Sequence, residues 1–437
     1  MHYSKTVVSL FSGCGGMDLG FEGDFEVLSR SINPKTHPNL DGLRVSKKGW
    51  VHLPKTGFKT IFANDITRRA YSSWIPYFSK RGISKRAFHL ESIVDLVKHH
   101  HDPQHPFTFP SADVVTGGFP CQDFSLAGKR KGLHSHRDHR GKLREETDDI
   151  EEATAENRGQ LYMWMKQVVE IVRPAVFVAE NVKGLVSLDQ VKTIIENDFK
   201  QIGSGFIVLP AHVLNASHFG VPQNRQRVIF LGLNRDRMHP EVLSLFDQMD
   251  QIPLLDHLNP YPIQSHAPSR SSISSKGVER GESLCAPVVT VGECLKGLPE
   301  PHRAKDPTQQ GYSRAKWYGK HCQGQTEVKL DDVGPTIRSE HHGNIEFRRL
   351  HPDHGGQYNR EFKRGRKERR LTVRECARIQ TFPDQFKFVR PTDQRKDKRY
   401  RLSVSDGYKV VGNAVPPLLA FHLAWRLREI WDDLFRQ

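Results

Sequence analysis

The feature that most constrains the fold is a series of short apolar segments, each followed by glycine or polar residues and separated by stretches with helical spacing. These segments span residues 6–11, 60–63, 112–116, 175–179 and 227–232. Strands that alternate with helices build a parallel sheet with helices on both faces, and ligands bind along the edge where the strands' carboxyl ends meet. We therefore predict an α/β fold with a doubly wound, Rossmann-like sheet.

Composition changes after about residue 235. Residues 236–370 are rich in Pro, Ser, His, Gly and Arg and show weak periodicity, and they end in a basic cluster at 363–370. We predict a larger domain over 1–235, to which a C-terminal segment (404–437) returns with an amphipathic helix. A second, smaller and irregular domain with a hinge covers 236–403. Residues 30–58 are expected to form a surface insertion.

The charge balance favours a polyanionic partner. Lys and Arg number 65 against 50 Asp and Glu, which gives a formal net charge of +15, and nucleic acid is the commonest partner of such chains. Six cysteines without a CxxC pair support neither a zinc site nor a structural disulfide framework. We expect no metal, and since there is neither a secretory signal nor an apolar run of about 20 residues, a cytoplasmic protein without membrane contact.

The first strand runs into the glycine turn Ser12-Gly13-Cys14-Gly15-Gly16. Such a turn lets the backbone approach a nucleotide-like ligand closely. The third glycine position of a dinucleotide fingerprint is occupied by Asp18, which disfavours a nicotinamide or flavin site and leaves another adenosine-containing ligand or a simple tight turn. Asp65, at the end of the second strand, is placed either to accept ribose hydroxyls or to cap the next helix.

A nucleophile, an acid and two cations follow at later strand ends. Cys121 comes after Gly117-Gly118-Phe119-Pro120, where two glycines leave room for a substrate and a proline fixes the backbone. Glu180 ends the next strand, and Arg225 and Arg227 lie two residues apart, hence on one face of a strand. Most cysteines are small buried apolar residues, but this set suits nucleophilic attack on an electron-poor ring.

Taken together, these motifs make the chain resemble the C5-cytosine-specific DNA methyltransferases, which use S-adenosylmethionine. The motifs occur in the family's order and cover most of the chain: Phe11-Ser12-Gly13-Cys14-Gly15-Gly16, Asn64-Asp65, Pro120-Cys121-Gln122, Glu180-Asn181-Val182, Gln223-x-Arg225-x-Arg227, Arg374 to Gln380 with Phe382-Pro383, and Gly412-Asn413-Ala414-Val415-Pro416. The family more often has Glu where this chain has Asp65. The resemblance implies a methyltransferase domain over 1–235 and a target-recognition domain over 236–403.

The resemblance also assigns roles to residues. It implies that S-adenosylmethionine is bound by Phe11, Ser12, Gly13, Cys14, Gly15, Gly16, Asp65, Glu91 and Asn413. It implies a catalytic group of Cys121, Glu180, Arg225 and Arg227. The candidate DNA contacts are Lys129, Arg130 and Lys131 in a mobile loop and Thr336, Arg338, Arg348 and Arg349 in the recognition domain, with further candidates at 340–344 and nonspecific phosphate attraction from 363–370.

The mechanism that the resemblance implies needs a cytosine flipped out of the duplex. Cys121 adds to ring C6, Glu180 donates a proton to N3, and Arg227 holds O2, so that C5 becomes nucleophilic enough to take the methyl group. Arg225 orients neighbouring groups such as Glu180. The loop that follows Cys121 is longer than family members usually have, with an insertion at 134–157 that contains an acidic stretch at 145–156.

Three readings remain at the sequence level. The first is a DNA cytosine-C5 methyltransferase of a bacterial type II restriction–modification system, whose partners are double-stranded DNA and a cognate endonuclease acting independently. The second is an RNA methyltransferase with the same catalytic core, against which the large basic recognition region argues. The third is a catalytically inactive DNA-binding protein, which the intact Cys121, Glu180 and Arg227 disfavour.

Overall fold

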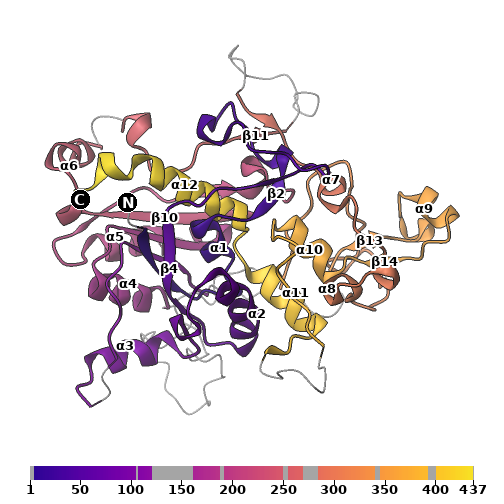
Figure 1. Ribbon diagram of the computed structural model, residues 1–437, viewed down its shortest axis with the longest axis horizontal. Helices are drawn as coiled ribbons and strands as arrows, with labels where there is room; N and C mark the ends of the chain where they lie inside the picture. The colour runs from indigo at the N-terminus through magenta and orange to yellow at the C-terminus, as the bar shows by residue number, and fades with distance from the viewer. Residues whose placement is uncertain are drawn as a thin grey trace.

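A mixed sheet of eight strands lies at the centre of the larger body of the molecule (Figure 1). The computed structural model describes residues 4–104, 107–120, 161–187, 191–249, 254–268, 284–339, 345–391 and 400–436. Within these, the sheet contains β1 (Lys5–Leu10), β4 (Phe58–Asn64), β5 (Phe88–His89), β6 (Val114–Gly118), β7 (Val176–Val182), β8 (Phe206–Val208), β9 (His212–Asn215) and β10 (Gln226–Asn234).

The strand order confirms the predicted doubly wound sheet. It runs β5-β4-β1-β6-β7-β10-β8, with β9 also paired to β10. Strands β5 to β7 along this order are parallel, whereas β10 is antiparallel to β7, β8 and β9. After β1, the next two strands of the sheet along the chain, β4 and β5, are added on one side of β1. The following strand, β6, pairs with the other side of β1. The space between the carboxyl ends of β1 and β6 is therefore the switch point at which such sheets bind ligands.

Each face of the sheet is covered by a layer of helices. Val7 packs into a core with α1 (Gly16–Glu22), α2 (Arg68–Phe78) and α12 (Pro417–Leu434), and its neighbour Val8 points the other way. That opposite core includes α3 (Ile93–His101), α4 (Leu161–Val172) and α5 (Val191–Lys200). Successive side chains of β1 therefore pack into opposite cores, as expected for a strand that is buried on both faces of the sheet.

The C-terminal helix α12 returns to the larger body and lies along α1 (Figure 1). Gly20 permits this contact, because a Cβ there would lie 2.4 Å from both Ala420 Cβ and the Pro417 carbonyl oxygen. No helix in the described segments is both long and apolar enough to cross a bilayer.

Residues 30–58 differ from the expected surface insertion. β2 (Glu26–Leu28) pairs with β3 (Trp50–His52), and the segment contributes buried side chains to the core: Ile32, Leu40, Val51 and Leu53. The segment is polar on average and its apolar residues are spaced irregularly, so the sequence has no periodic pattern that would predict their burial.

A smaller lobe, orange in Figure 1, lies beside the larger body. It contains α7 (Val291–Leu295), α8 (Pro307–Gln310), β13 (Phe347–Arg349), α9 (Asn359–Lys363), β14 (Arg369–Arg370) and α10 (Val373–Ile379), with α11 (Val404–Asn413) packed against α10. The chain between the two parts carries α6 (Pro240–Asp247), β11 (His266–Ala267) and β12 (Ala286–Pro287).

Most of residues 236–267 lie with the larger body, although the sequence places a domain boundary at 235. The His239 amide donates to the Leu434 carbonyl (3.0 Å), and the Tyr261 hydroxyl donates to the Ile229 carbonyl (3.0 Å). The change in composition therefore precedes the point at which the chain leaves the larger body.

Candidate active site

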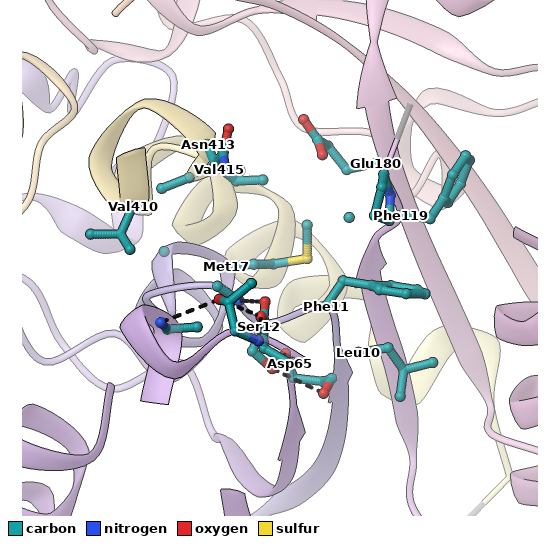
Figure 2. A pocket seen from close by; sticks show the side chains of 18 of the residues that line it. Leu10, Phe11, Ser12, Met17, Asp65, Phe119, Glu180, Val410, Asn413 and Val415 are labelled. Atoms are coloured by element: carbon teal, nitrogen blue, oxygen red, sulfur yellow. Dashed lines mark hydrogen bonds between the residues drawn. The ribbon is translucent and has the colours of Figure 1, made fainter. Parts of the chain in front are cut away.

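A cavity of about 560 Å³ opens at the carboxyl ends of β1, β4, β6 and β7. Figure 2 shows Glu180 toward one end of it and Ser12 and Asp65 toward the other. Its walls include the first glycine turn, the ends of β4, β6 and β7, the start of β10 and the end of α11: Phe11, Ser12, Gly13, Gly16, Asp65, Gly118, Pro120, Glu180, Arg227, Gly412 and Asn413. The cavity thus joins the predicted methyl-donor residues to the predicted catalytic residues.

The turn after β1 has a backbone that few residues adopt. Phe11 has φ 52° and Gly13 has φ 56°, both in the left-handed region. The Ser12 amide donates to the Asn64 carbonyl (2.8 Å), and the Gly13 amide donates to Asp65 Oδ2 (3.0 Å). The end of β4 therefore shapes the turn after β1.

Asp65 combines both roles left open by the sequence. Its Oδ1 accepts bonds from the amide and hydroxyl of Thr67 (2.7 Å each), which precedes α2, while its Oδ2 faces Gly13. A carboxylate has about four acceptor positions, so capacity remains on the cavity side for a ligand hydroxyl. Burial raises the pKa of this carboxyl, and the bonds from Thr67 oppose that rise.

Asp18 supports the turn from behind, a role that the sequence did not reveal. Its carboxylate accepts bonds from the Ser9 hydroxyl and the Trp74 indole N–H (2.5 Å each), and the Ser12 hydroxyl lies 2.9 Å from Ser9 Oγ. Burial raises the pKa of Asp18 to about 6. The residue that replaces the third fingerprint glycine thus ties β1, α1 and α2 together beneath the cavity.

Glu180 and Arg227 form a buried ion pair across two strands. Arg227 lies opposite Val182 in the β10–β7 register, two residues from Glu180 and on the same face. Arg227 Nε lies 2.7 Å from Glu180 Oε1. Burial raises the pKa of the Glu180 carboxyl, and Arg227 opposes the rise. The structure therefore brings this acid and this guanidinium together, as the sequence predicted.

Gly118 leaves the second oxygen of Glu180 open toward the cavity. A Cβ at Gly118 would lie 3.0 Å from Glu180 Oε2, which is tight for any side chain. The neighbouring Asn181 donates from Nδ2 to the Phe119 carbonyl (3.1 Å) and so fixes the backbone before Pro120. Cys121, the predicted nucleophile, follows Pro120 in the chain but lies outside the described residues, as do Lys129, Arg130, Lys131 and the insertion at 134–157.

Arg225 lines the cavity, and its charge joins that of Arg227 in opposing the rise in the pKa of Glu180, but its hydrogen bonds go to backbone carbonyls. Its side chain is buried at 1% exposure and donates from Nη1 to the Ile337 carbonyl (3.0 Å) and from Nη2 to the Gly412 carbonyl (2.9 Å). Arg225 lies one residue before the start of β10, so the alternation of side chains along that strand does not direct its guanidinium toward Glu180. It connects the smaller lobe to the end of α11.

Three predicted donor residues do not line the cavity. Cys14 is buried, with Sγ 3.3 Å from the Val410 carbonyl, and burial raises its thiol pKa. Gly15, at φ 87°, lies against Phe78 and Trp74. The Glu91 carboxylate lies 3.3 Å from His99 Nδ1, whereas the adjacent Ser92 and Ile93 reach the cavity wall.

The candidate DNA-reading residues divide into two groups. Thr336 is half-buried and its hydroxyl donates to the Asn224 carbonyl (2.7 Å), and Arg338 is half-buried with Nη1 3.8 Å from Glu346 Oε1. Arg348 and Arg349 instead bind Glu361, and Arg349, at 1% exposure, also binds Glu300 (2.7 Å). In this arrangement both guanidinium groups are held by carboxylates of the smaller lobe, and base reading by Arg348 and Arg349 stays a prediction.

The basic cluster at 363–370 is also partly internal. Arg369 binds Glu375 and Glu300, and Arg370 donates to buried backbone carbonyls of the smaller lobe. Only the stretch 363–367 is exposed. A run of like charges in a sequence cannot show which members have acidic partners far away in the chain.

Comparison with known proteins identifies the family. The model of the C-5 cytosine-specific DNA methylases matches residues 50–429, and the chain belongs to this family. It is 26% identical to the type II methyltransferase M.NgoFVII of Neisseria gonorrhoeae over 99% of this chain and 88% of that protein. It is 28% identical to the type II methyltransferase M.BsuRI of Bacillus subtilis over 95% of this chain and 77% of that protein.

Solved structures show the same fold. The Entamoeba histolytica methyltransferase EhMeth matches with a TM-score of 0.53 at 13% identity, over 98% of each chain. The DNMT2 of Spodoptera frugiperda matches with a TM-score of 0.52 at 15% identity, over 97% of this chain and 99% of that one. The arrangement of a doubly wound sheet with an added lobe is thus shared.

Proposed function

We propose that this chain methylates C5 of cytosine in a specific duplex DNA site, as the modification enzyme of a type II restriction–modification pair. The observation that carries the proposal is the single cavity in which the first glycine turn, the Glu180–Arg227 pair and Pro120, directly before Cys121, meet. Relatives named type II methyltransferases align over nearly the whole chain. The family and the net charge of +15 support DNA as the substrate.

The cavity suits a methyl donor that contains adenosine. Its volume of about 560 Å³ lies within the range of roughly 300–1,000 Å³ typical of small-ligand sites. Ile66 and Ile93 supply apolar wall for a base, and Asp65 supplies acceptors for ribose hydroxyls. We assign the binding of S-adenosylmethionine to this half of the cavity; when bound, it supplies an electrophilic methyl group on a sulfonium.

The chain's own residues then activate the cytosine. The Cys121 thiolate adds to ring C6, and protonated Glu180 donates its proton to N3, so that the electron pair of the broken double bond becomes available at C5. The Arg227 guanidinium holds O2 and keeps Glu180 in place through its 2.7 Å contact. After C5 gains the methyl group, a water takes the C5 proton and the C6–S bond breaks, which releases the Cys121 thiolate. N3 returns its proton to Glu180, and the aromatic ring is restored.

Bisulfite sequencing of DNA from a host that expresses the chain tests the proposal. We expect methylcytosine at one short recurrent sequence and none when the host expresses Cys121→Ala. Unmethylated DNA together with methylated RNA would replace the proposal by RNA methylation, and no transfer to either would leave only a binding protein.

The covalent step has a separate test. Duplex DNA that carries 5-fluorocytosine at the target position cannot lose the C5 substituent, so the enzyme is expected to remain attached after methyl transfer. A band of enzyme–DNA adduct on a denaturing gel should form with the natural chain and be absent with Cys121→Ala. A stable adduct with Cys121→Ala would contradict the assignment of this thiol.

A further inference from the structure

A buried seam joins the two lobes beside the cavity. We use "seam" for residues 222–225, before β10, together with 334–338 of the smaller lobe and 411–415, which end α11 and directly follow it. The first two segments pair through their backbones: the Asn224 amide donates to the Gly334 carbonyl (2.7 Å), and the Gly334 amide donates to the Pro222 carbonyl (3.0 Å). The seam therefore begins as a strand-like contact between the lobes.

Two buried side chains hold both backbone groups of Ile337. Gln223 accepts the Ile337 amide at Oε1 (2.9 Å), and Arg225 donates to the Ile337 carbonyl (3.0 Å). Thr336, the adjacent candidate contact to DNA, donates to the backbone of residue 224. The position of Thr336 is consequently set by the segment that leads into β10 and Arg227.

The same side chains reach the segment that lines the donor half of the cavity. Gln223 donates to Gln380 Oε1 (3.0 Å), Gln380 donates to the Val411 carbonyl (2.9 Å), and Arg225 donates to the Gly412 carbonyl (2.9 Å). Gly412 touches the smaller lobe directly, since a Cβ there would lie 2.1 Å from the Arg338 carbonyl oxygen. Gly412 to Val415 line the cavity, and the Val415 carbonyl lies against Gly16.

We propose that Gln223 and Gln380 are positioning residues that couple occupancy of the methyl-donor half of the cavity to DNA binding at Thr336–Arg338. The inference rests on the proposed function and adds a regulatory property to that site. A ligand that contacts 412–415 fixes the carbonyls of Val411 and Gly412, and the amide relay passes this constraint to both backbone groups of Ile337. Amides buried at 0% exposure cannot exchange these bonds for water, so a shift at one end moves the other.

The test compares duplex DNA affinity with and without S-adenosylhomocysteine, the unreactive demethylated product. The probe is a fluorescent 40-base-pair duplex that carries the site found by bisulfite sequencing, or random sequence if no site is found. Coupled sites typically change each other's affinity by about 5–150-fold. We define the ratio as the DNA affinity with S-adenosylhomocysteine divided by the affinity without it. We expect a ratio of about 5–150 for the natural chain. For Gln380→Met, which keeps the side-chain volume but removes the amide, we expect a ratio near 1.

The matched control is Gln309→Met. Gln309 is as buried as Gln380, in the same lobe, and its amide bonds Pro299 and Thr372 away from the cavity. We expect it to keep the natural ratio. By reciprocity the affinity for S-adenosylhomocysteine must change by the same factor when DNA is added, a readout that a merely structural loss of stability would not move.

Outcomes separate the coupling from the proposed function. The coupling is overturned if the affinity ratio of Gln380→Met lies within twofold of the ratio of the natural chain. It is also overturned if the natural chain methylates DNA but has a ratio of 1. Absence of methyl transfer to DNA overturns the proposed function, while the binding ratio still decides the coupling. If Gln380→Met does not fold, Gln223→Met, which removes the other amide of the relay, is judged by the same ratio.

Discussion

At the scale of single residues, the Glu180 carboxyl is the group whose chemistry the site most clearly prepares. Burial raises its pKa and therefore favours the protonated form that can donate to a ring nitrogen, while Arg227 fixes its orientation. Gln at this position keeps the shape but has no acidic proton to transfer. We expect Glu180→Gln to lower kcat by about 10²–10⁴-fold and to change DNA affinity far less, as measured by single-turnover methyl transfer and anisotropy.

A matched control for this change is Glu22→Gln. Glu22 is also buried at 8% exposure, its pKa is also raised by burial, and it binds Arg81 and the Thr60 amide outside the cavity. We expect kcat of Glu22→Gln to stay within about threefold of the natural enzyme, since general acid catalysis requires contact with the substrate. Equal losses in the two variants would show that buried charge, and not proton donation, explains the effect.

Residue by residue, the sequence located the site better than it located individual partners. Glu180 and Arg227 were predictable because both lie at strand ends that the sheet topology brings together. Arg225 was predicted to orient neighbouring groups such as Glu180, and spacing alone does not show that its guanidinium donates to the carbonyls of Ile337 and Gly412. The contacts of Asn181 beside the cavity and of Gln223 in the seam reach residues 62 and 114 positions away, for which the sequence carries no local signal.

At the scale of elements, the contact of α1 with α12 depends on Gly20. An added Cβ would lie 2.4 Å from the Pro417 carbonyl oxygen and 2.7 Å from the Phe421 amide nitrogen, and backbone atoms cannot rotate away. We expect Gly20→Ala to lower the free energy of unfolding by about 1–3 kcal/mol, as measured by urea denaturation. Adding Ala420→Gly should restore only part of the loss, because the clash with the backbone remains. Unchanged stability of the single variant would contradict this packing.

The long strands rich in β-branched residues could be predicted from the sequence, whereas the shortest strands could not. The strands β1, β4, β6, β7 and β10 carry runs of β-branched residues, and the structure places each within two residues of its predicted bounds, except that β7 ends three residues later than predicted. The strands β5, β8 and β9 have only two to four residues each and give no periodic signal. Thr372 and Glu375 form a capping box at the start of α10, and their spacing of three residues is the usual sequence signature of such a box.

At the scale of the whole molecule, the segment 30–58, α12 and β11 enclose three buried histidines. His37 and His422 lie with ring centroids 4.8 Å apart, and His266 completes the cluster. Arg426 and Arg30 are the charged groups that face it, and both disfavour further positive charge. Burial lowers the pKa of all three imidazoles, that of His37 to about 4. The natively folded cluster is therefore neutral.

This cluster predicts that acid weakens the association of these three segments. The unfolded histidines take up protons near pH 6.5, whereas the folded ones resist until lower pH, so their contribution to stability is complete above about 6.5 and falls as the pH decreases toward 4. The slope is about 1.4 kcal/mol per pH unit for each histidine. Asp18, with a pKa of about 6, acts in the opposite direction over the same range, so the informative quantity is a difference between variants.

The experiment measures the free energy of unfolding at pH 7.5, 6.0 and 5.0 for the natural chain, for His422→Phe, and for His302→Gln at an exposed position. His422→Phe keeps a ring of similar size but cannot bind a proton, so its stability should fall less steeply below pH 6.5, by about 1.4 kcal/mol per pH unit relative to the natural chain. His302→Gln should follow the natural chain. Parallel curves of stability against pH for all three proteins would show that the histidine cluster is not a source of acid sensitivity. In that case His422 would bind protons equally well in the folded and the unfolded chain, which requires that water reaches it in the folded state.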